Sequence, residues 1–144
     1  MSIGKLLNIS ISAPAALALE WDDGRVSHVD LAALIASRPN LAPLGKPSEF
    51  KQATLSNDGW SVEWPCGIDF GAQQLRRWVD ERAGDIMPVA DFRAWMEGHG
   101  LTLDRAADAL GLSRRTIAYY LSGEQPVPKT VMLATAGYDH RRAA

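Results

Sequence analysis

Two adjacent arginines near the start of a short predicted helix are the residues of this sequence best suited to recognise a ligand. Arg114 and Arg115 follow Ser113 in the segment 101–121, LTLDRAADALGLSRRTIAYYL, in which two amphipathic stretches meet at Gly111. This pattern is typical of a helix-turn-helix, whose second helix presents its side chains to the major groove of DNA. One arginine can donate two parallel hydrogen bonds to guanine, which discriminates that base by about 1–3 kcal/mol. The segment therefore predicts readout of double-stranded DNA.

Two further residues share the outward face of this helix. Ala118 and Tyr119 lie four positions after the two arginines, so the four side chains project from one side of the helix. Ala118 can contact a thymine methyl group, and Tyr119 can bind a phosphate or pack against a sugar. Exposed N–H groups at helix starts attract anions, which indicates a set of phosphate ligands. These candidates are Thr102, Ser113 and Thr116.

The surrounding residues are those needed to hold two helices at a steep angle. Thr102 can cap the first helix and Ser113 the second, and Asp104 complements the dipole of the first. Gly111 can adopt the left-handed conformation that turns the chain between them. The residues expected to face inward are Ala106, Ala107, Leu110, Leu112, Ile117, Tyr120 and Leu121. A merely solvated pair of arginines is the alternative interpretation, but this pattern favours recognition.

Further helices are expected on both sides of the motif. Val89–Met96 has apolar residues at helical spacing, with Pro88 in the first turn and Gly98 to Gly100 at the end. Another helix is expected from Val127 onward, with Pro128 near its start.

The stretch 88–135 resembles the lambda-repressor/Cro-like (Xre-type) helix-turn-helix superfamily. The residues that carry the resemblance are Leu101-Thr102, Ala107, Gly111-Leu112-Ser113, Ile117, Tyr120 and Gly123…Pro126. It implies an all-α DNA-binding domain. Leu103 stands where these domains usually have a glutamine that binds a phosphate, which implies a weaker phosphate anchor in this chain.

The first half of the chain is expected to be β-rich with short helices. Alternating apolar residues predict strands, and Asp22-Asp23-Gly24 is a hairpin turn signal. The expected strands are 6–11, 17–21, 25–30, 50–55 and 60–64, and the expected helices are 31–37 and 73–83.

This half resembles a small bacterial family, the domain-of-unknown-function family 2442 (DUF2442). The resemblance rests on Leu19–Gly24, Val29-Asp30-Leu31, Leu44…Phe50 and Val62–Phe70. It implies a small α+β domain and assigns no chemistry. Cys66 departs from the family pattern, in which an asparagine is expected before the glycine.

Composition limits the classes of function. The 144 residues fit one domain or two small ones, and the net charge is −2. Residues 1–84 hold 8 Lys/Arg and 10 Asp/Glu, and residues 85–144 hold 7 of each. Any DNA affinity must therefore come from local placement of charge. One cysteine excludes an internal disulfide and favours a reducing cytoplasm, and no apolar run reaches membrane-spanning length.

No other pattern of reactive residues is convincing. Cys66 has no histidine or aspartate context that would activate it, and His28, His99 and His140 lack the spacing of metal ligands. We therefore expect no metal, no cofactor and no enzymatic activity. The five tryptophans are interpreted as core or domain-interface packing rather than as a platform for bases.

The sequence therefore predicts an α+β domain over 1–84, followed by an all-α helix-turn-helix domain over 85–144. The favoured function is a sequence-specific, bacterial-type transcriptional regulator that binds double-stranded DNA as a homodimer. The N-terminal domain would serve dimerisation or partner binding. Two alternatives stay open: an antitoxin-type interaction module whose partner is a toxin, and an enzyme with an unrecognised site near Cys66 and His28.

Overall fold

A computed structural model describes residues 4–143 of the chain. The chain divides into two compact units, Met1–Val79 and Asp80–Ala144, whose boundary falls inside helix α3 (Ala72–Ala83). The boundary expected from the sequence, at Gly84, lies just after the end of the same helix. The α+β class of the first unit and the helical class of the second are confirmed.

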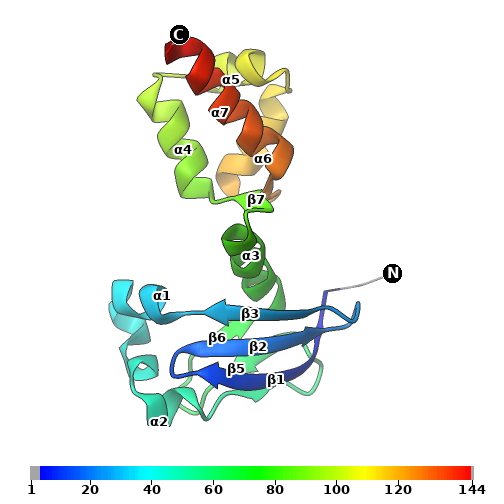
Figure 1. Cartoon of the computed structure of the whole chain (residues 1–144), viewed down its shortest axis with the longest axis vertical. Coiled ribbons are helices and arrows are strands. Elements are labelled where there is room, and N and C mark those ends of the chain that lie inside the picture. The colour runs from blue at the N-terminus through cyan, green and yellow to red at the C-terminus, as the bar shows by residue number, and fades with distance from the viewer. Residues whose placement is uncertain (1–3, 144) are drawn as a thin grey trace. The chain divides into compact units, whose positions relative to one another are not determined.

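The N-terminal unit contains two antiparallel three-stranded sheets. Figure 1 shows the first sheet as three neighbouring strands in the order β1-β2-β3. The second sheet has the order β4-β5-β6. The strands are β1 (Leu6–Ala13), β2 (Ala16–Trp21), β3 (Val26–Asp30), β4 (Thr54–Leu55), β5 (Ser61–Glu63) and β6 (Asp69–Gly71). As expected, Asp22-Asp23-Gly24 joins β2 to β3, with Gly24 at a φ of +86°.

Short helices follow the first sheet and complete one hydrophobic core. They are α1 (Ala32–Ser37), the 3₁₀ helix η1 (Pro39–Gly45) and α2 (Pro47–Phe50). The largest fully buried side chains of this unit are Trp21, Phe50, Leu6, Leu17, Leu19, Leu31, Leu44, Leu75, Val29 and Val62. Trp64 is buried as well, whereas Trp60 stays partly exposed, so the packing interpretation of the tryptophans fits most of them.

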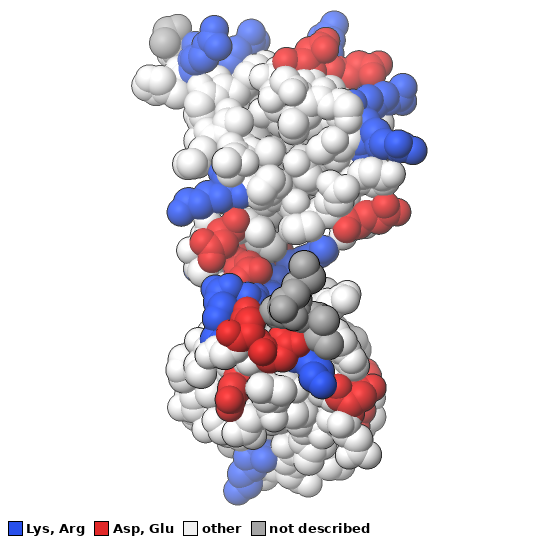
Figure 2. Space-filling model, turned by 90° about the vertical axis from the view of Figure 1, so that its right-hand side faces the viewer, with Lys and Arg blue, Asp and Glu red and all other residues white. Residues whose placement is uncertain are grey.

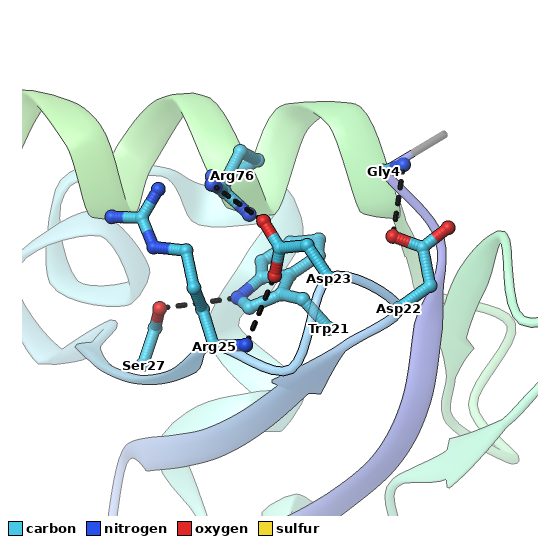
Figure 3. A network of polar contacts seen from close by, with 7 residues as sticks. All are labelled: Gly4, Trp21, Asp22, Asp23, Arg25, Ser27 and Arg76. Carbon is cyan, nitrogen blue, oxygen red and sulfur yellow. Dashed lines mark hydrogen bonds and ion pairs between the residues drawn. The ribbon is translucent and has the colours of Figure 1, made fainter. Parts of the chain in front are cut away.

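Helix α3 is tied to the first sheet at the β2–β3 hairpin (Figure 3). The guanidinium of Arg76 lies 5.0 Å from the ring centroid of Trp21, and its Nη2 lies 3.5 Å from Oδ2 of Asp23. Trp21 in turn donates its indole N–H to Oγ of Ser27 over 3.1 Å. The hairpin and the helix therefore share one set of polar and cation–π contacts.

The strand expected over 50–55 is wrong in its first part. Phe50 ends helix α2, which begins with Pro47 at its first position and has Glu49 in its first turn. Proline is favoured at this position because it has no N–H to leave unsatisfied. Only Thr54 and Leu55 pair as a strand, with Glu63 and Val62.

The C-terminal unit is a small helical bundle (Figure 1). Its elements are β7 (Ile86–Met87), α4 (Val89–Gly98), α5 (Leu103–Leu110), α6 (Arg114–Ser122), β8 (Val127–Pro128) and α7 (Lys129–Ala143). Its core consists of Phe92, Trp95, Met96, Ala106, Ala107, Ile117, Tyr120, Val127 and Val131. Among residues 4–143, none of the helices has the length and apolar character needed to cross a bilayer.

The last helix begins later than the sequence predicts. Val127 and Pro128 form a short strand that pairs antiparallel with Met87 and Ile86. The helix begins only at Lys129. Pro128 can occupy this strand because a short edge strand tolerates the loss of one N–H donor.

Candidate nucleic-acid interface

Helix α5 begins at the cap that its sequence predicts. Oγ1 of Thr102 accepts a hydrogen bond from the N–H of Arg105 over 3.2 Å, and Thr102 itself has an extended backbone. Asp104 is exposed in the first turn, where its charge complements the positive end of the helix dipole. The hydroxyl of Thr102 keeps its own O–H available for a phosphate.

The turn between α5 and α6 depends on a glycine. Gly111 has a φ of +69°, a conformation that costs other residues about 1–2 kcal/mol. The N–H of Leu112 donates to the carbonyl of Ala107 over 2.9 Å, and Gly111 donates to Asp108 over 3.4 Å. This Schellman arrangement satisfies the last carbonyls of α5 and directs the chain into the next helix.

Helix α6 begins at Ser113, as predicted. Oγ of Ser113 accepts a hydrogen bond from the N–H of Thr116 over 3.1 Å and lies 2.9 Å from Oγ1 of Thr116. The two hydroxyls therefore bond to each other, and one O–H of the pair stays available as a donor. The candidate phosphate ligands at this helix start thus act as a pair.

The inward face of α6 is fixed by packing. Ile117 is fully buried, and the ring of Tyr120 packs edge-on against Phe92 with centroids 5.6 Å apart. Burial raises the pKa of the Tyr120 hydroxyl above its ordinary value, because the charged phenolate is poorly solvated there. At the other end of the helix, Nη2 of Arg93 donates to the carbonyl of Leu121 over 3.2 Å. These contacts set the rotation of α6 and therefore which residues face outward.

The outward face of α6 holds the four predicted readout residues together. Arg114, Arg115 and Ala118 are exposed, and Tyr119 is half-buried. The guanidinium of Arg115 lies 5.9 Å from the ring centroid of Tyr119, a distance at which the ring weakly orients the cation. The helix thus presents two guanidiniums and one phenol on one side of its first two turns.

One residue of this surface has a role that sequence reasoning missed. Nε of Arg114 lies 3.8 Å from Oδ1 of Asp104, and the two side chains are 66% and 73% exposed. The sequence predicts for Asp104 only an interaction with the helix dipole. The two residues are ten positions apart on different helices, and only the geometry of the turn at Gly111 brings them together. The sequence signal that could have suggested the contact between Asp104 and Arg114 is the steep turn predicted between two capped helix starts.

The C-terminal helix is held against α4 by a partly exposed polar contact that no sequence pattern indicates. The indole N–H of Trp95 donates to Oδ1 of Asp139 over 2.9 Å, and Nε2 of His99 lies 2.6 Å from the same oxygen. The ring of Tyr138 packs edge-on against both Trp95 and His99. This cluster positions α7, and through the shared core it supports α6.

Charge is mixed over the molecule. Figure 2 shows acidic side chains lying among the basic ones on the displayed face. Among residues 4–143, the structure brings no three metal-ligating side chains close enough to share a metal ion. Cys66 is exposed and borders a shallow depression next to Lys46 and Glu49.

Comparison with known proteins gives matches over both units. A family model described as "Protein of unknown function (DUF2442)" matches residues 8–81, and a model described as "Helix-turn-helix" matches residues 92–135. A solved structure, "Putative DNA Binding Protein NE0471" from Nitrosomonas europaea ATCC 19718, is 34% identical. That match covers 94% of this chain and 86% of the other, with a TM-score of 0.58. No curated protein matches the chain. The chain belongs to the DUF2442 family and carries a C-terminal helix-turn-helix domain.

Proposed function

We propose that this protein is a sequence-specific DNA-binding transcriptional regulator that reads the major groove with helix α6. The observation that carries the proposal is the exposure of Arg114 and Arg115 on the first turn of a helix whose opposite face is locked into the core. In a helix-turn-helix, the N-terminal residues of the second helix are those that reach base edges. The name of the similar protein from Nitrosomonas europaea supports the DNA-binding part of this proposal.

The proposal gives each exposed residue a distinct role. Arg114 and Arg115 bind guanine through O6 and N7, and Ala118 contacts a thymine methyl group. Tyr119 binds a phosphate or sugar beside the bases. The phosphate contacts come from the helix starts, through Thr102, Ser113 and Thr116. Arg114 must leave Asp104 to reach a base, so that weak ion pair competes with DNA.

The mixed charge of the chain implies that one copy binds weakly. With 7 basic and 7 acidic residues over 85–144, non-specific attraction to phosphates is small. A homodimer that places two recognition helices about 34 Å apart overcomes this limit by reading two half-sites. We therefore expect a short inverted repeat as the target and steep dependence of affinity on salt.

The experiment is selection of bound sites from a random duplex pool with the full chain, followed by titration of the selected duplex. Replacing Arg114 and Arg115 by alanine should relax the sequence preference, because each base contact contributes about 1–3 kcal/mol of discrimination. The matched control replaces Arg141 and Arg142 by alanine, which removes the same charge from the last turn of α7.

Two results would overturn this assignment. If the wild-type chain enriches no sequence, the protein does not read DNA. If the variant lacking Arg114 and Arg115 selects the same sites with wild-type affinity, the recognition face lies elsewhere. A control variant that loses specificity as strongly would show that total charge, rather than α6, determines binding.

The proposal assigns binding and no catalysis to the chain. The antitoxin hypothesis makes a different prediction for the N-terminal unit, because it requires a toxin partner encoded nearby. Under that hypothesis, co-expression of this chain with a toxic neighbouring gene product would restore growth. A DNA-binding regulator that has no such partner would not restore growth.

A further inference from the structure

The edge of the first sheet offers an interface of its own. Strand β1 lies at the end of the order β1-β2-β3, so only one of its sides pairs with β2 (Figure 1). Its first residue, Leu6, donates its N–H to the carbonyl of Gly59 over 2.8 Å. Beyond Leu6, no further backbone partner on this side is found among the described residues. An unpaired strand edge is a template for another strand.

The register shows which backbone groups this edge presents. Trp21 donates its N–H to the carbonyl of Arg25, so alternate residues of β2 direct their backbone groups toward β3. Ala18, one of the residues between them, faces β1 and lies opposite Ser10. Ser10 therefore pairs with β2, whereas Ile9 and Ile11 direct their N–H and C=O groups outward. The register is regular from residue 8 to residue 11.

The edge has none of the charges or prolines by which many proteins prevent strand pairing, and its two register irregularities, between Leu6 and Asn8 and between Ile11 and Ala13, leave residues 8–11 regular. No charged residue occurs between Lys5 and Glu20, and β1 contains no proline. Large apolar side chains are also exposed on it: Leu7 is 52% and Ile11 is 36% exposed. The opposite edge strand, β3, contains Asp30 and is preceded by Arg25. The uncharged edge is therefore the one suited to association.

We propose that β1 pairs antiparallel with β1 of a second copy of this chain, which joins the two sheets into one across a two-fold axis. In this register Ile9 lies opposite Ile11 of the second copy, and Ser10 lies opposite its own counterpart on the axis. Ile9 already packs partly against the core, so the pairing covers the exposed side of Ile11. Pairing stops near Leu6, where Gly59 occupies the edge.

A second copy is the occupant that this edge fits best. Like charges directly opposite each other destabilise a strand pair. Because β1 carries no charged residue, two copies of it can pair without such repulsion. Two-fold pairing uses β1 of both copies and closes at two chains, whereas β1 against β3 would continue into filaments. The inference rests on the proposed function in one respect, because an inverted repeat requires two recognition helices.

The test places charge on the axis. Ser10→Lys or Ser10→Glu in the full chain puts two like charges opposite each other in the dimer, while the side chain stays solvent-exposed in the single chain. The mass in solution is measured without DNA, with circular dichroism as a check on folding. We expect the wild type at twice 15.7 kDa, each variant shifted toward 15.7 kDa, and an equimolar mixture of the two variants dimeric again.

The matched control is His28→Lys. His28 lies in the same cross-strand row as Ser10 and Ala18 but on the opposite edge, so this variant should stay dimeric. The inference is overturned by a wild type with the mass of one chain, by Ser10 variants that dimerise like the wild type, or by a control that dissociates as they do. If the wild type is dimeric and the Ser10 variants dissociate as expected, but the wild type enriches no duplex, the proposed function is refuted and the proposed interface is still supported.

Discussion

Asp104 provides a sharp test of how Arg114 acts. In the unbound protein the two side chains form an exposed ion pair at 3.8 Å, which the proposed contact of Arg114 with a base would break. Exposed pairs of this kind contribute at most about 1 kcal/mol, so removing the carboxylate should strengthen binding by up to about fivefold. The variant Asp104→Asn also removes a negative charge next to the phosphates. We therefore expect tighter binding from the loss of a native contact.

The same substitution should lower stability. The carboxylate of Asp104 lies in the first turn of α5, where a negative charge stabilises a helix by about 0.3–1 kcal/mol. The free energy of unfolding should therefore fall by about this amount while affinity for DNA rises. A rise in affinity for DNA together with a fall in the free energy of unfolding would show that Asp104 competes with DNA. A general improvement of the fold would instead raise both quantities.

The assay is a fluorescence anisotropy titration of the selected duplex, paired with denaturant unfolding of the same samples. Asp108→Asn is the matched control, since it removes an exposed carboxylate from the same helix without touching Arg114. The gain in affinity should shrink to that of the Asp108→Asn control when Asp104→Asn is combined with Arg114→Ala. A gain in that double variant as large as in Asp104→Asn alone, or no gain at all, would refute the competition between Asp104 and DNA.

Two further predictions concern the core that orients α6. Ile117 is fully buried, so Ile117→Ala should lower the free energy of unfolding by about 2–5 kcal/mol in denaturant titrations; a loss below about 1 kcal/mol would show that α6 is not packed as described. Burial raises the pKa of Tyr120 above its ordinary value near 10, so its stabilising contribution is complete below that pH and is lost as pH rises through the folded-state pKa. Unfolding measured from pH 8 to 11 should therefore show a steeper alkaline loss in the wild type than in Tyr120→Phe, and equal slopes would contradict the assigned burial.

The helix-turn-helix was predictable because its signals are local. Thr102 and Ser113 lie within three residues of the N–H groups that they cap, and Gly111 is required by a positive φ at its own position. The rotation of α6 followed from the spacing of Ile117 and Tyr120. The spacing therefore predicts, without any knowledge of distant contacts, that the four candidate readout residues share one face.

The parts that could not be predicted depend on distant partners or on very short elements. The strand pair β7–β8 has two residues on each side and includes Pro128, so it carries no periodic signal. Asp139 meets Trp95 across 44 positions of sequence. The apolar character of Phe50 fits a strand as well as a helix, although Pro47 marks the helix start. Tertiary packing decided each of these cases.

The most direct test of the central claim is amide chemical-shift mapping by NMR while the selected duplex is added to the full chain. We expect the largest shift changes at the start of α6, from Ser113 to Tyr119, and at Thr102 where α5 begins. The amides of strands β1–β3 should change little at constant oligomeric state. Changes confined to the N-terminal unit, or to α7 with α6 unaffected, would contradict recognition by Arg114 and Arg115.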